Sequence, residues 1–178
     1  MKKFTPPRNR DAWGVIRGYV YQVELTIDRW LNLEKDQELE LECGEDIDRI
    51  TKSFDKDDDE QCRILEQVKR RDDSITLRKT SAIIAIACAV EHIENNPGLN
   101  LVFQYTTNAR IGIERPSPFP KRKAAITVWE HIRKNNRQLD SREQTENIAR
   151  IYSILGGVPK PSQLCDRTWQ LFQNFITK

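Results

Sequence analysis

The sequence predicts an α/β domain in which a small mixed sheet is flanked by helices and followed by a helical C-terminal region. Three observations indicate this fold class: helical spacing of apolar residues near the N-terminus, several short strand-like segments after it, and helical spacing throughout the last third. A length of 178 residues suits one domain. We expect a single domain over 1–178, with an α/β core at 12–110 and a helical extension at 120–178.

The first helix is expected over residues 15–33, where apolar side chains recur every three or four positions. These side chains are Ile16, Tyr19, Val20, Val23, Ile27, Trp30 and Leu31. Glutamates then alternate with apolar residues up to Cys43, which is typical of a half-buried strand. A second strand is expected at 47–50, after the break at Gly44.

A third strand is expected at 61–69, which is rich in apolar and β-branched residues and is followed by turn-forming residues. Residues 82–95 are apolar on nearly every side, as in a helix packed flat on a sheet, and Pro97-Gly98 ends them. Residues 101–106 predict another strand. The expected order is therefore α-β-β-β-α-β.

Three amphipathic stretches near 122–135, 141–155 and 161–176 predict the helical C-terminal region. The last stretch carries a dense apolar set: Trp169, Leu171, Phe172, Phe175 and Ile176. Two interpretations of this set remain open. It forms an interface with a second copy of the chain, or it packs back on apolar residues of the same chain, namely Trp129, Ile132, Ile151 and Leu155.

Charge is unevenly distributed along the chain. Residues 34–60 hold 13 acidic and 4 basic side chains, a net charge of −9, although the whole chain has a net charge of +2. An acidic centre in a basic body suits a protein that binds cations with its middle and phosphates with its rim. For Asp55 and the run at 57–60, a solvated acidic loop is the simpler interpretation.

Several functional classes are excluded by composition. The longest apolar run, residues 82–90, is too short to span a membrane. No apolar stretch follows the basic N-terminus, so no secretory signal is expected and a cytoplasmic location follows. The four cysteines contain no C-x-x-C pair, which argues against a zinc site or a disulfide framework.

Three polar residues on two predicted strands form the most informative pattern: Asp46, and about twenty positions later Gln67 and Lys69. The carboxylate of Asp46, the side-chain carbonyl of Gln67 and a backbone carbonyl at Val68 are oxygen ligands that suit magnesium or manganese. If the reaction is hydrolysis of a phosphodiester, Lys69 would stabilise the negative charge that develops on the phosphate, or orient the attacking water. The alternative is an edge strand with exposed polar residues.

Neighbouring acidic residues allow more than one role. Glu66 faces away from Gln67 in a regular strand, which favours a structural ion pair or a contact with a helix. A bulge at Gly44 could bring Glu45 or Glu42 toward the metal, whereas regular alternation turns Glu42 toward solvent or a helix.

Basic residues near this pattern are the expected phosphate contacts if the ligand is a nucleic acid such as DNA, because neutralising phosphates supplies most of the nonspecific affinity of such binding. Arg70 and Arg71 follow Lys69 directly. Arg17, on the first helix, would either touch a phosphate or hold Glu45 or Asp46 in place.

The order of elements and four motifs together resemble the PD-(D/E)xK restriction-endonuclease-like superfamily, and within it the effector nuclease domain of bacterial anti-phage systems. The motifs are residues 16–22 (IRGYVYQ), 42–47 (ECGEDI), 66–69 (EQVK) and 105–109 (YTTNA). The resemblance covers roughly residues 12–110. In CBASS defence such a domain, a double-stranded-DNA endonuclease associated with CD-NTases, is joined to a sensor of cyclic oligonucleotides, and related domains are fused to NTPase receptors.

The resemblance implies a metal-dependent endonuclease that cuts double-stranded DNA with little sequence preference. It implies that Asp46 and Gln67 bind metal and that Lys69 is the catalytic lysine. The superfamily often adds an acidic residue from the first helix, where this chain has Gln22 with Glu24 nearby.

The resemblance also implies partners. Cutting both strands of a duplex favours a homo-oligomer, and a sensor or NTPase domain is expected in the same chain or in a partner, so the chain is either a small protein or the N-terminal part of a longer one. Two alternatives are a catalytically silent domain of the same fold that binds nucleic acid or a partner, and a small regulatory adaptor.

Overall fold

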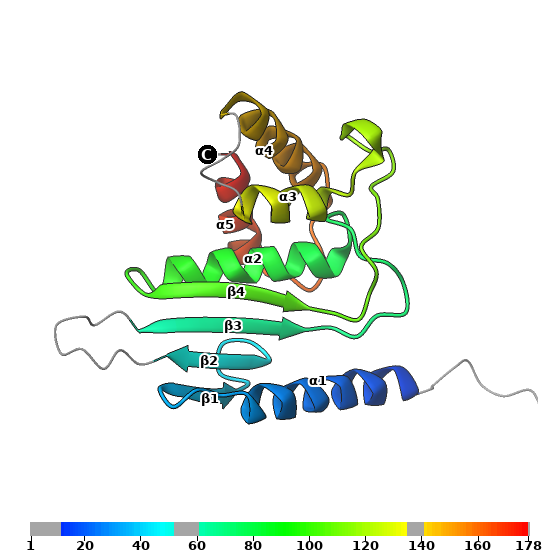
Figure 1. Ribbon diagram of the computed structural model, residues 1–178. Helices are drawn as coiled ribbons and strands as arrows, with labels where there is room; N and C mark the ends of the chain where they lie inside the picture. Colours follow the sequence, from blue (N-terminus) through cyan, green and yellow to red (C-terminus); the bar gives the residue numbers. More distant parts are fainter. Residues whose placement is uncertain (1–11, 52–60, 135–140, 178) are drawn as a thin grey trace, which may run out of the picture.

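The computed structural model describes residues 12–51, 61–134 and 141–177 (Figure 1). The acidic run 57–60 and Asp55 lie outside these residues. The described elements, in chain order, are α1 (Trp13–Leu31), β1 (Gln37–Leu41), β2 (Ile47–Thr51), β3 (Cys62–Val68), α2 (Thr80–Asn95), β4 (Asn100–Thr106), a 3₁₀ turn η1 (Pro120–Arg122), α3 (Ala125–Lys134), α4 (Ser141–Gly156) and α5 (Asp166–Thr177). The predicted order α-β-β-β-α-β, followed by a helical region, is confirmed.

The four described strands form one mixed sheet in the order β1-β2-β3-β4. The pairs β1–β2 and β2–β3 are antiparallel, and β3–β4 is parallel because α2 carries the chain back across the sheet. In this register Ile47 pairs with Glu66, and Val68 pairs with Thr106. The turn between β1 and β2 therefore meets the C-terminal ends of β3 and β4.

Helices cover both faces of the sheet. Figure 1 shows α2 with α3, α4 and α5 gathered on one side and α1 on the other. Successive residues of β3 face opposite sides of the sheet. Leu65 lines a pocket together with His92 of α2, whereas Glu66 accepts a hydrogen bond from Arg29 of α1. The alternation predicted for this strand is thus confirmed.

The main core lies between α2 and the C-terminal helices rather than on the sheet alone. It contains buried apolar side chains from α2, from the loops after β3 and β4, from the three C-terminal helices and from the segment between α4 and α5. They are Leu77, Ile83, Ala87, Phe119, Ala125, Val128, Ile132, Ile151, Ile154, Leu155, Leu164, Phe172 and Ile176. Each large side chain buried in this way contributes about 1.5–3 kcal/mol of transfer free energy.

The apolar set of α5 packs within its own chain. Phe172 is fully buried, Trp169 stacks on it with ring centroids 5.1 Å apart, and Phe175 makes an edge contact with Tyr152. The interpretation of this set as an interface with a second copy is therefore wrong for most of its members. The helix begins at Asp166 rather than near 161, because the preceding residues form a separate turn.

A buried carboxylate joins the helical region to the α/β core. Glu114, only 2% exposed, accepts a hydrogen bond from the backbone N–H of Leu77 at 3.0 Å and one from Ala125 at 2.9 Å. Ala125 is the first residue of α3, where unpaired N–H groups and the helix dipole favour a negative charge. Glu114 thereby fixes the start of α3 against the loop before α2.

The helix α1 differs from its prediction in one respect. It forms over Trp13–Leu31, yet none of its residues is buried, and its apolar side chains are largely exposed. The half-buried residues of α1, which face the sheet, include Tyr21, Gln22 and Arg29. Periodicity identified the apolar stripe correctly, but the side of the helix opposite this stripe is the one that contacts the sheet.

Two expectations from composition can be compared with the described residues. None of their helices is long and apolar enough to cross a membrane. All four cysteines lie in the described part of the chain, and all are free.

Candidate active site

The turn between β1 and β2 is held by the buried side chain of Asp48. Its Oδ2 accepts the N–H of Gly44 at 2.7 Å, and its Oδ1 accepts the N–H of Glu45 at 3.1 Å. A Cβ on Gly44 would lie 2.6 Å from the side chain of Leu65 and 2.9 Å from Asp48, so only glycine allows this close approach. The turn therefore presents Glu45 and Asp46 in one defined position.

Asp48 is itself anchored by an arginine. The guanidinium of Arg63 lies 2.6 Å from Asp48 and 2.7 Å from Glu40. Its hydrogen bond to Asp48 raises the pKa of Arg63 above its ordinary value, so the group stays charged. Because Asp48 is fully buried, this pairing supplies the countercharge that its burial requires.

Asp46 and Lys69 lie together, as the sequence predicts. Oδ2 of Asp46 accepts the backbone N–H of Val68 at 2.7 Å and lies 3.4 Å from Nζ of Lys69. The backbone N–H of Lys69 donates to the carbonyl of Thr106. This bond continues the β3–β4 pairing and fixes the position of the Lys69 backbone. The Asp46 side chain is 17% exposed and that of Lys69 is 42% exposed, so the pair is accessible from one side.

Gln67 brings an oxygen without a hydrogen-bond partner to the same place. Its Nε2 donates to Oε2 of Glu45 at 3.3 Å, whereas its Oε1 is buried and receives no hydrogen bond from the described residues. Reversing the amide would set Oε1 against the Glu45 carboxylate, so this orientation is favoured. A buried unpaired carbonyl oxygen costs about 1–3 kcal/mol, which a cation at this position would recover.

Glu45 lies between Gln67 and a histidine from α2. Its Oε1 is 3.5 Å from Nε2 of His92. Burial raises the pKa of Glu45 above its ordinary value; the charges of Asp46 and Asp48 add to the rise, and His92 and Lys69 oppose it. Holding this carboxyl ionised is therefore costly unless more positive charge is bound nearby.

These residues offer an oxygen-rich set for a divalent cation. Glu45 and Asp46 bring carboxylates, and Gln67 brings the orphaned amide oxygen, which are donors that magnesium and manganese prefer. In the described part of the chain, no group of three or more His, Cys, Asp and Glu residues has an arrangement that could hold a metal. The set therefore depends on Gln67, and the backbone carbonyl of Val68 is the further donor that the sequence predicts.

The residues expected from the first helix lie apart from this cluster. Gln22 donates to Oε1 of Glu42 at 2.7 Å, and Glu24 is exposed. Glu42 has a positive φ of 56° in the β1–β2 turn, and its side chain contacts Gln22 of α1. Its backbone N–H donates to the carbonyl of Asp46 at 3.5 Å, but among the described contacts neither the side chain of Gln22 nor that of Glu42 reaches the side chains of Asp46 and Lys69.

The structural role predicted for Glu66 is confirmed. Its carboxylate is fully buried and accepts two hydrogen bonds from Arg29, each 2.9 Å long, and one from Thr106 at 2.6 Å. Gln104 donates a further, longer bond at 3.3 Å. Glu66 thus attaches α1 to the middle of the sheet and points away from the site.

The predicted DNA-contacting arginines gather around Asp72, just after β3. Arg70 lies 2.9 Å from Asp72, and Arg17 of α1 lies 3.8 Å from the same carboxylate. The backbone N–H of Arg71 donates to Oδ1 of Asn108 at 2.7 Å, and Nδ2 of Asn108 donates to the backbone carbonyl of Arg71 at 2.8 Å. Arg17 therefore contacts this loop and not Glu45 or Asp46.

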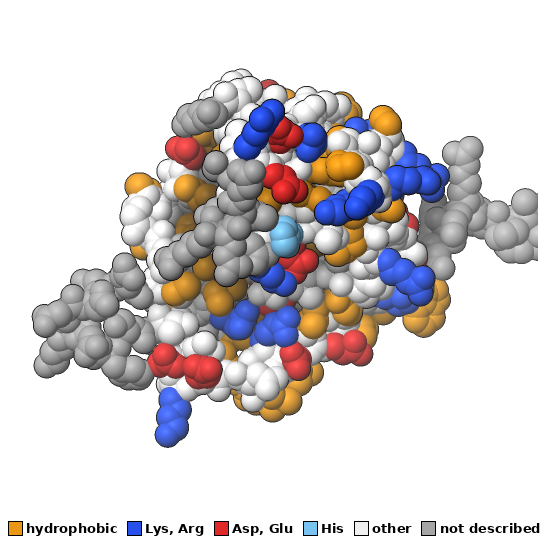
Figure 2. Space-filling model, turned by 45° about the horizontal axis from the view of Figure 1, so that its top comes forward, with side chains coloured by type: hydrophobic (Ala, Val, Ile, Leu, Met, Phe, Trp, Pro, Cys, Tyr) orange, Lys and Arg blue, Asp and Glu red, His pale blue; other side chains and the backbone are white. Residues whose placement is uncertain are grey.

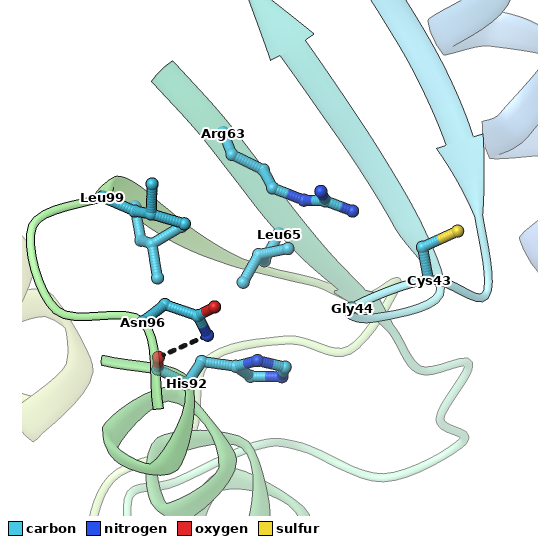
Figure 3. Close-up of a pocket in the computed structure, with 8 residues that line it drawn as sticks. Cys43, Gly44, Arg63, Leu65, His92, Asn96 and Leu99 are labelled. Atoms are coloured by element: carbon cyan, nitrogen blue, oxygen red, sulfur yellow. Dashed lines mark hydrogen bonds between the residues drawn. The ribbon is translucent and has the colours of Figure 1, made fainter. Parts of the chain in front are cut away.

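Sequence reasoning missed the site roles of Asp48, Arg63 and His92. His92 and Arg63 line a pocket of about 190 Å³ that also includes Gly44 and Leu65 (Figure 3). Figure 3 shows the His92 ring directed from α2 toward the turn at Gly44. Alternation along β2 offered a signal for Asp48, but nothing in the spacing of α2 distinguishes His92, because its partner is remote in sequence.

The thiol of Cys88, on α2, is half-buried near the site. Burial, together with the charges of Glu45 and Glu91, raises the pKa of Cys88 to about 11. The thiol is therefore protonated near neutral pH.

Comparison of the chain with protein-family models, with curated proteins and with solved structures gives no significant match. The resemblance to restriction-endonuclease-like effector nucleases therefore stands on the four motifs and on the arrangement of elements.

Proposed function

We propose that this chain is a metal-dependent endonuclease of the restriction-endonuclease-like fold, which hydrolyses double-stranded DNA with little sequence preference and serves as an effector in anti-phage defence. One observation carries the proposal: the orphaned oxygen of Gln67 lies in a cluster with Glu45, Asp46 and Lys69. In the proposal a sensor or NTPase domain, in the same chain or in a partner, controls the activity.

Each residue of the cluster has a defined role in this proposal. Asp46, Glu45, the side-chain oxygen of Gln67 and the backbone carbonyl of Val68 hold magnesium or manganese. When bound, the cation polarises the scissile phosphate and acidifies a water molecule. Lys69 exchanges its contact with Asp46 for one with the phosphate, where its ammonium stabilises the negative charge that develops as the P–O bond breaks.

Asp48 and Arg63 position the acidic residues without touching the substrate. Asp48 holds the two N–H groups that shape the turn, and Arg63 pairs with the Asp48 carboxylate. His92 restrains one oxygen of Glu45, which leaves the other toward Gln67. The acidic cluster is therefore already arranged before a cation binds, which lowers the reorganisation that catalysis requires.

DNA affinity is assigned to the arginines beside Lys69. On the face shown in Figure 2, Lys and Arg side chains lie beside Asp and Glu side chains rather than apart from them. A mixed surface of this kind favours local phosphate contacts over a broad cationic platform. In the proposal, Arg70, which pairs with Asp72, and its neighbour Arg71 make such contacts beyond the site.

The first prediction is cleavage itself. The purified chain, or its parent protein once activated, is expected to cut plasmid DNA with magnesium or manganese, and EDTA is expected to abolish the cutting. Calorimetric titration is expected to detect manganese binding, and Gln67→Leu, which removes the orphaned oxygen while preserving side-chain volume, is expected to weaken it. Cleavage that survives EDTA, or manganese binding unchanged in Gln67→Leu, would contradict the proposed metal site.

The second prediction concerns the salt dependence of DNA binding. Replacing Arg70 and Arg71 together by alanine is expected to weaken binding and flatten its dependence on salt, with each lost phosphate contact lowering the slope by roughly 0.9. Arg142→Ala with Arg150→Ala is the matched control, because these arginines lie on α4 beside Glu146. Fluorescence anisotropy across a salt series measures both slopes. Equal slopes for the two double variants would place the DNA elsewhere.

A second candidate function is a catalytically silent domain of the same fold that binds nucleic acid or a partner. The contact between Lys69 and Asp46 at 3.4 Å favours it, because a lysine can neutralise this acid without any cation. The two functions differ in the titration above: a silent domain gives neither a manganese signal nor cleavage, even when it binds DNA with the predicted salt dependence.

A further inference from the structure

The helix α1 contacts its own domain through polar side chains. Arg29 binds Glu66, and Gln22 binds Glu42. Both partners belong to the sheet or its turn, so these contacts define which side of α1 faces inward. The opposite side of the helix carries most of its apolar residues.

That outward side bears a regular apolar stripe. Its six members follow one another at alternating spacings of three and four residues, the pattern of a two-helix interface. In chain order they are Trp13, Ile16, Val20, Val23, Ile27 and Trp30. All six are exposed, from 38% for Val23 to 65% for Trp30, although monomeric proteins rarely expose a contiguous apolar surface along a whole helix. Figure 2 shows hydrophobic side chains at the lower edge, the side where Figure 1 places α1.

We propose that α1 is a self-association surface, through which two copies of this chain pair their α1 helices antiparallel about a two-fold axis. The stripe is the same in both directions: tryptophan at each end, isoleucine next and valine at the centre. Antiparallel pairing sets Trp13 opposite the partner's Trp30, Ile16 opposite the partner's Ile27, and Val20 opposite the partner's Val23. A palindromic stripe is self-complementary, as a two-fold interface requires.

Charges beside the stripe fit the same arrangement. Arg17 and Glu24 lie seven residues apart, on one flank of the stripe. In an antiparallel pair this flank of one helix faces the same flank of the other helix. Arg17 therefore approaches the partner's Glu24, and two-fold symmetry gives the same contact a second time. The present contact of Arg17 with Asp72 is 3.8 Å long between two exposed side chains, and such pairs contribute little.

A second copy fits this surface better than a lipid bilayer does. Helices that lie on membranes carry an excess of Lys and Arg beside their apolar face. The charged residues of α1 are Arg17, Glu24, Asp28 and Arg29, which sum to zero. The interface does not depend on the nuclease assignment. If that assignment holds, the two-fold pair supplies two equivalent sites for two antiparallel DNA strands.

Sedimentation velocity on the full chain over a concentration series tests this proposal. The wild type is expected to form a dimer. Ile27→Glu places a charge within the stripe of each copy and is expected to raise the dimer dissociation constant at least about a hundredfold. Ile93→Glu is the matched control, because Ile93 is also on a helix and is exposed to a similar extent, 52% against 48%. This control is expected to leave the dimer intact.

A charge exchange identifies the partner and its orientation. Arg17→Glu alone sets like charges together at both contacts and is expected to weaken the dimer, whereas Arg17→Glu combined with Glu24→Arg restores opposite charges and is expected to recover it. Circular dichroism confirms that each variant is folded. A wild type that stays monomeric at every concentration would overturn the proposal, as would a dimer insensitive to Ile27→Glu or a charge exchange that fails to restore association. A monomer that binds lipid vesicles would assign the stripe to membranes instead.

Discussion

Replacing Lys69 by alanine is expected to lower the rate of plasmid cleavage by about two to three orders of magnitude, the loss typical of removing one preorganised charge from a developing anion. The side chain is 42% exposed, and its described partner is Asp46 at 3.4 Å. Removing it therefore takes away catalytic charge without opening a cavity. The free energy of unfolding is expected to change by less than about 1 kcal/mol.

A matched lysine makes this experiment decisive. Lys79 is 44% exposed and also pairs with a carboxylate, that of Asp73, but it lies outside the candidate site. Lys79→Ala is expected to cleave at the wild-type rate. Initial rates with magnesium, together with thermal melting and a mock purification that excludes contaminating nuclease, measure the difference. A folded Lys69→Ala protein that cuts as fast as Lys79→Ala would refute the catalytic role of Lys69.

Replacing Arg29 by alanine is expected to destabilise the fold by about 3–5 kcal/mol, because it leaves a buried carboxylate without its countercharge. Glu66 is fully buried, and the Arg29 side chain is only 21% exposed. Arg150→Ala on α4, which breaks an exposed pair with Glu146, is the matched control, with an expected loss below about 1 kcal/mol. Combining Arg29→Ala with Glu66→Gln is expected to recover part of the loss, since no buried charge then remains. Urea denaturation measures each free energy.

The same ion pair predicts a dependence on pH. Burial opposes ionisation of Glu66, but hydrogen bonds from Arg29 and Thr106 and nearby positive charge outweigh it, so the pKa lies below the ordinary 4.5. The stabilisation is therefore fully present above pH 4.5 and is lost as the pH falls through the lowered pKa. The stability of Glu66→Gln is expected to fall less steeply with acid than that of the wild type. Two outcomes would show that the Arg29–Glu66 pair contributes little. One is a stability that falls equally steeply with acid in Glu66→Gln and in the wild type, and the other is a loss of unfolding free energy in Arg29→Ala no larger than in Arg150→Ala.

Local periodicity was sufficient to predict the described elements and their order. The strand that contains Gln67 and the helix after it follow from apolar spacing and turn residues within short segments. Asp46 and Lys69 were also predicted on strands, but Asp46 lies in the turn before β2 and Lys69 directly follows the end of β3. Alternation also predicted that Glu66 and Gln67 serve opposite faces, because the side-chain period of a strand is two. Consequently the sequence alone predicted that Asp46 and Lys69 would meet and that Glu66 would form a structural ion pair or a contact with a helix.

Only the tertiary structure decided which apolar surfaces are buried. The apolar stripes of α1 and α5 both follow helical spacing, yet Phe172 is fully buried whereas Trp30 is 65% exposed. Periodicity defines a face of a helix but carries no information on the element that covers it. The contact of Glu45 with His92 likewise joins segments that are distant in the chain. The burial that leaves the Gln67 oxygen unpaired also depends on such distant segments. Such contacts depend on how the elements pack, and no local pattern encodes them.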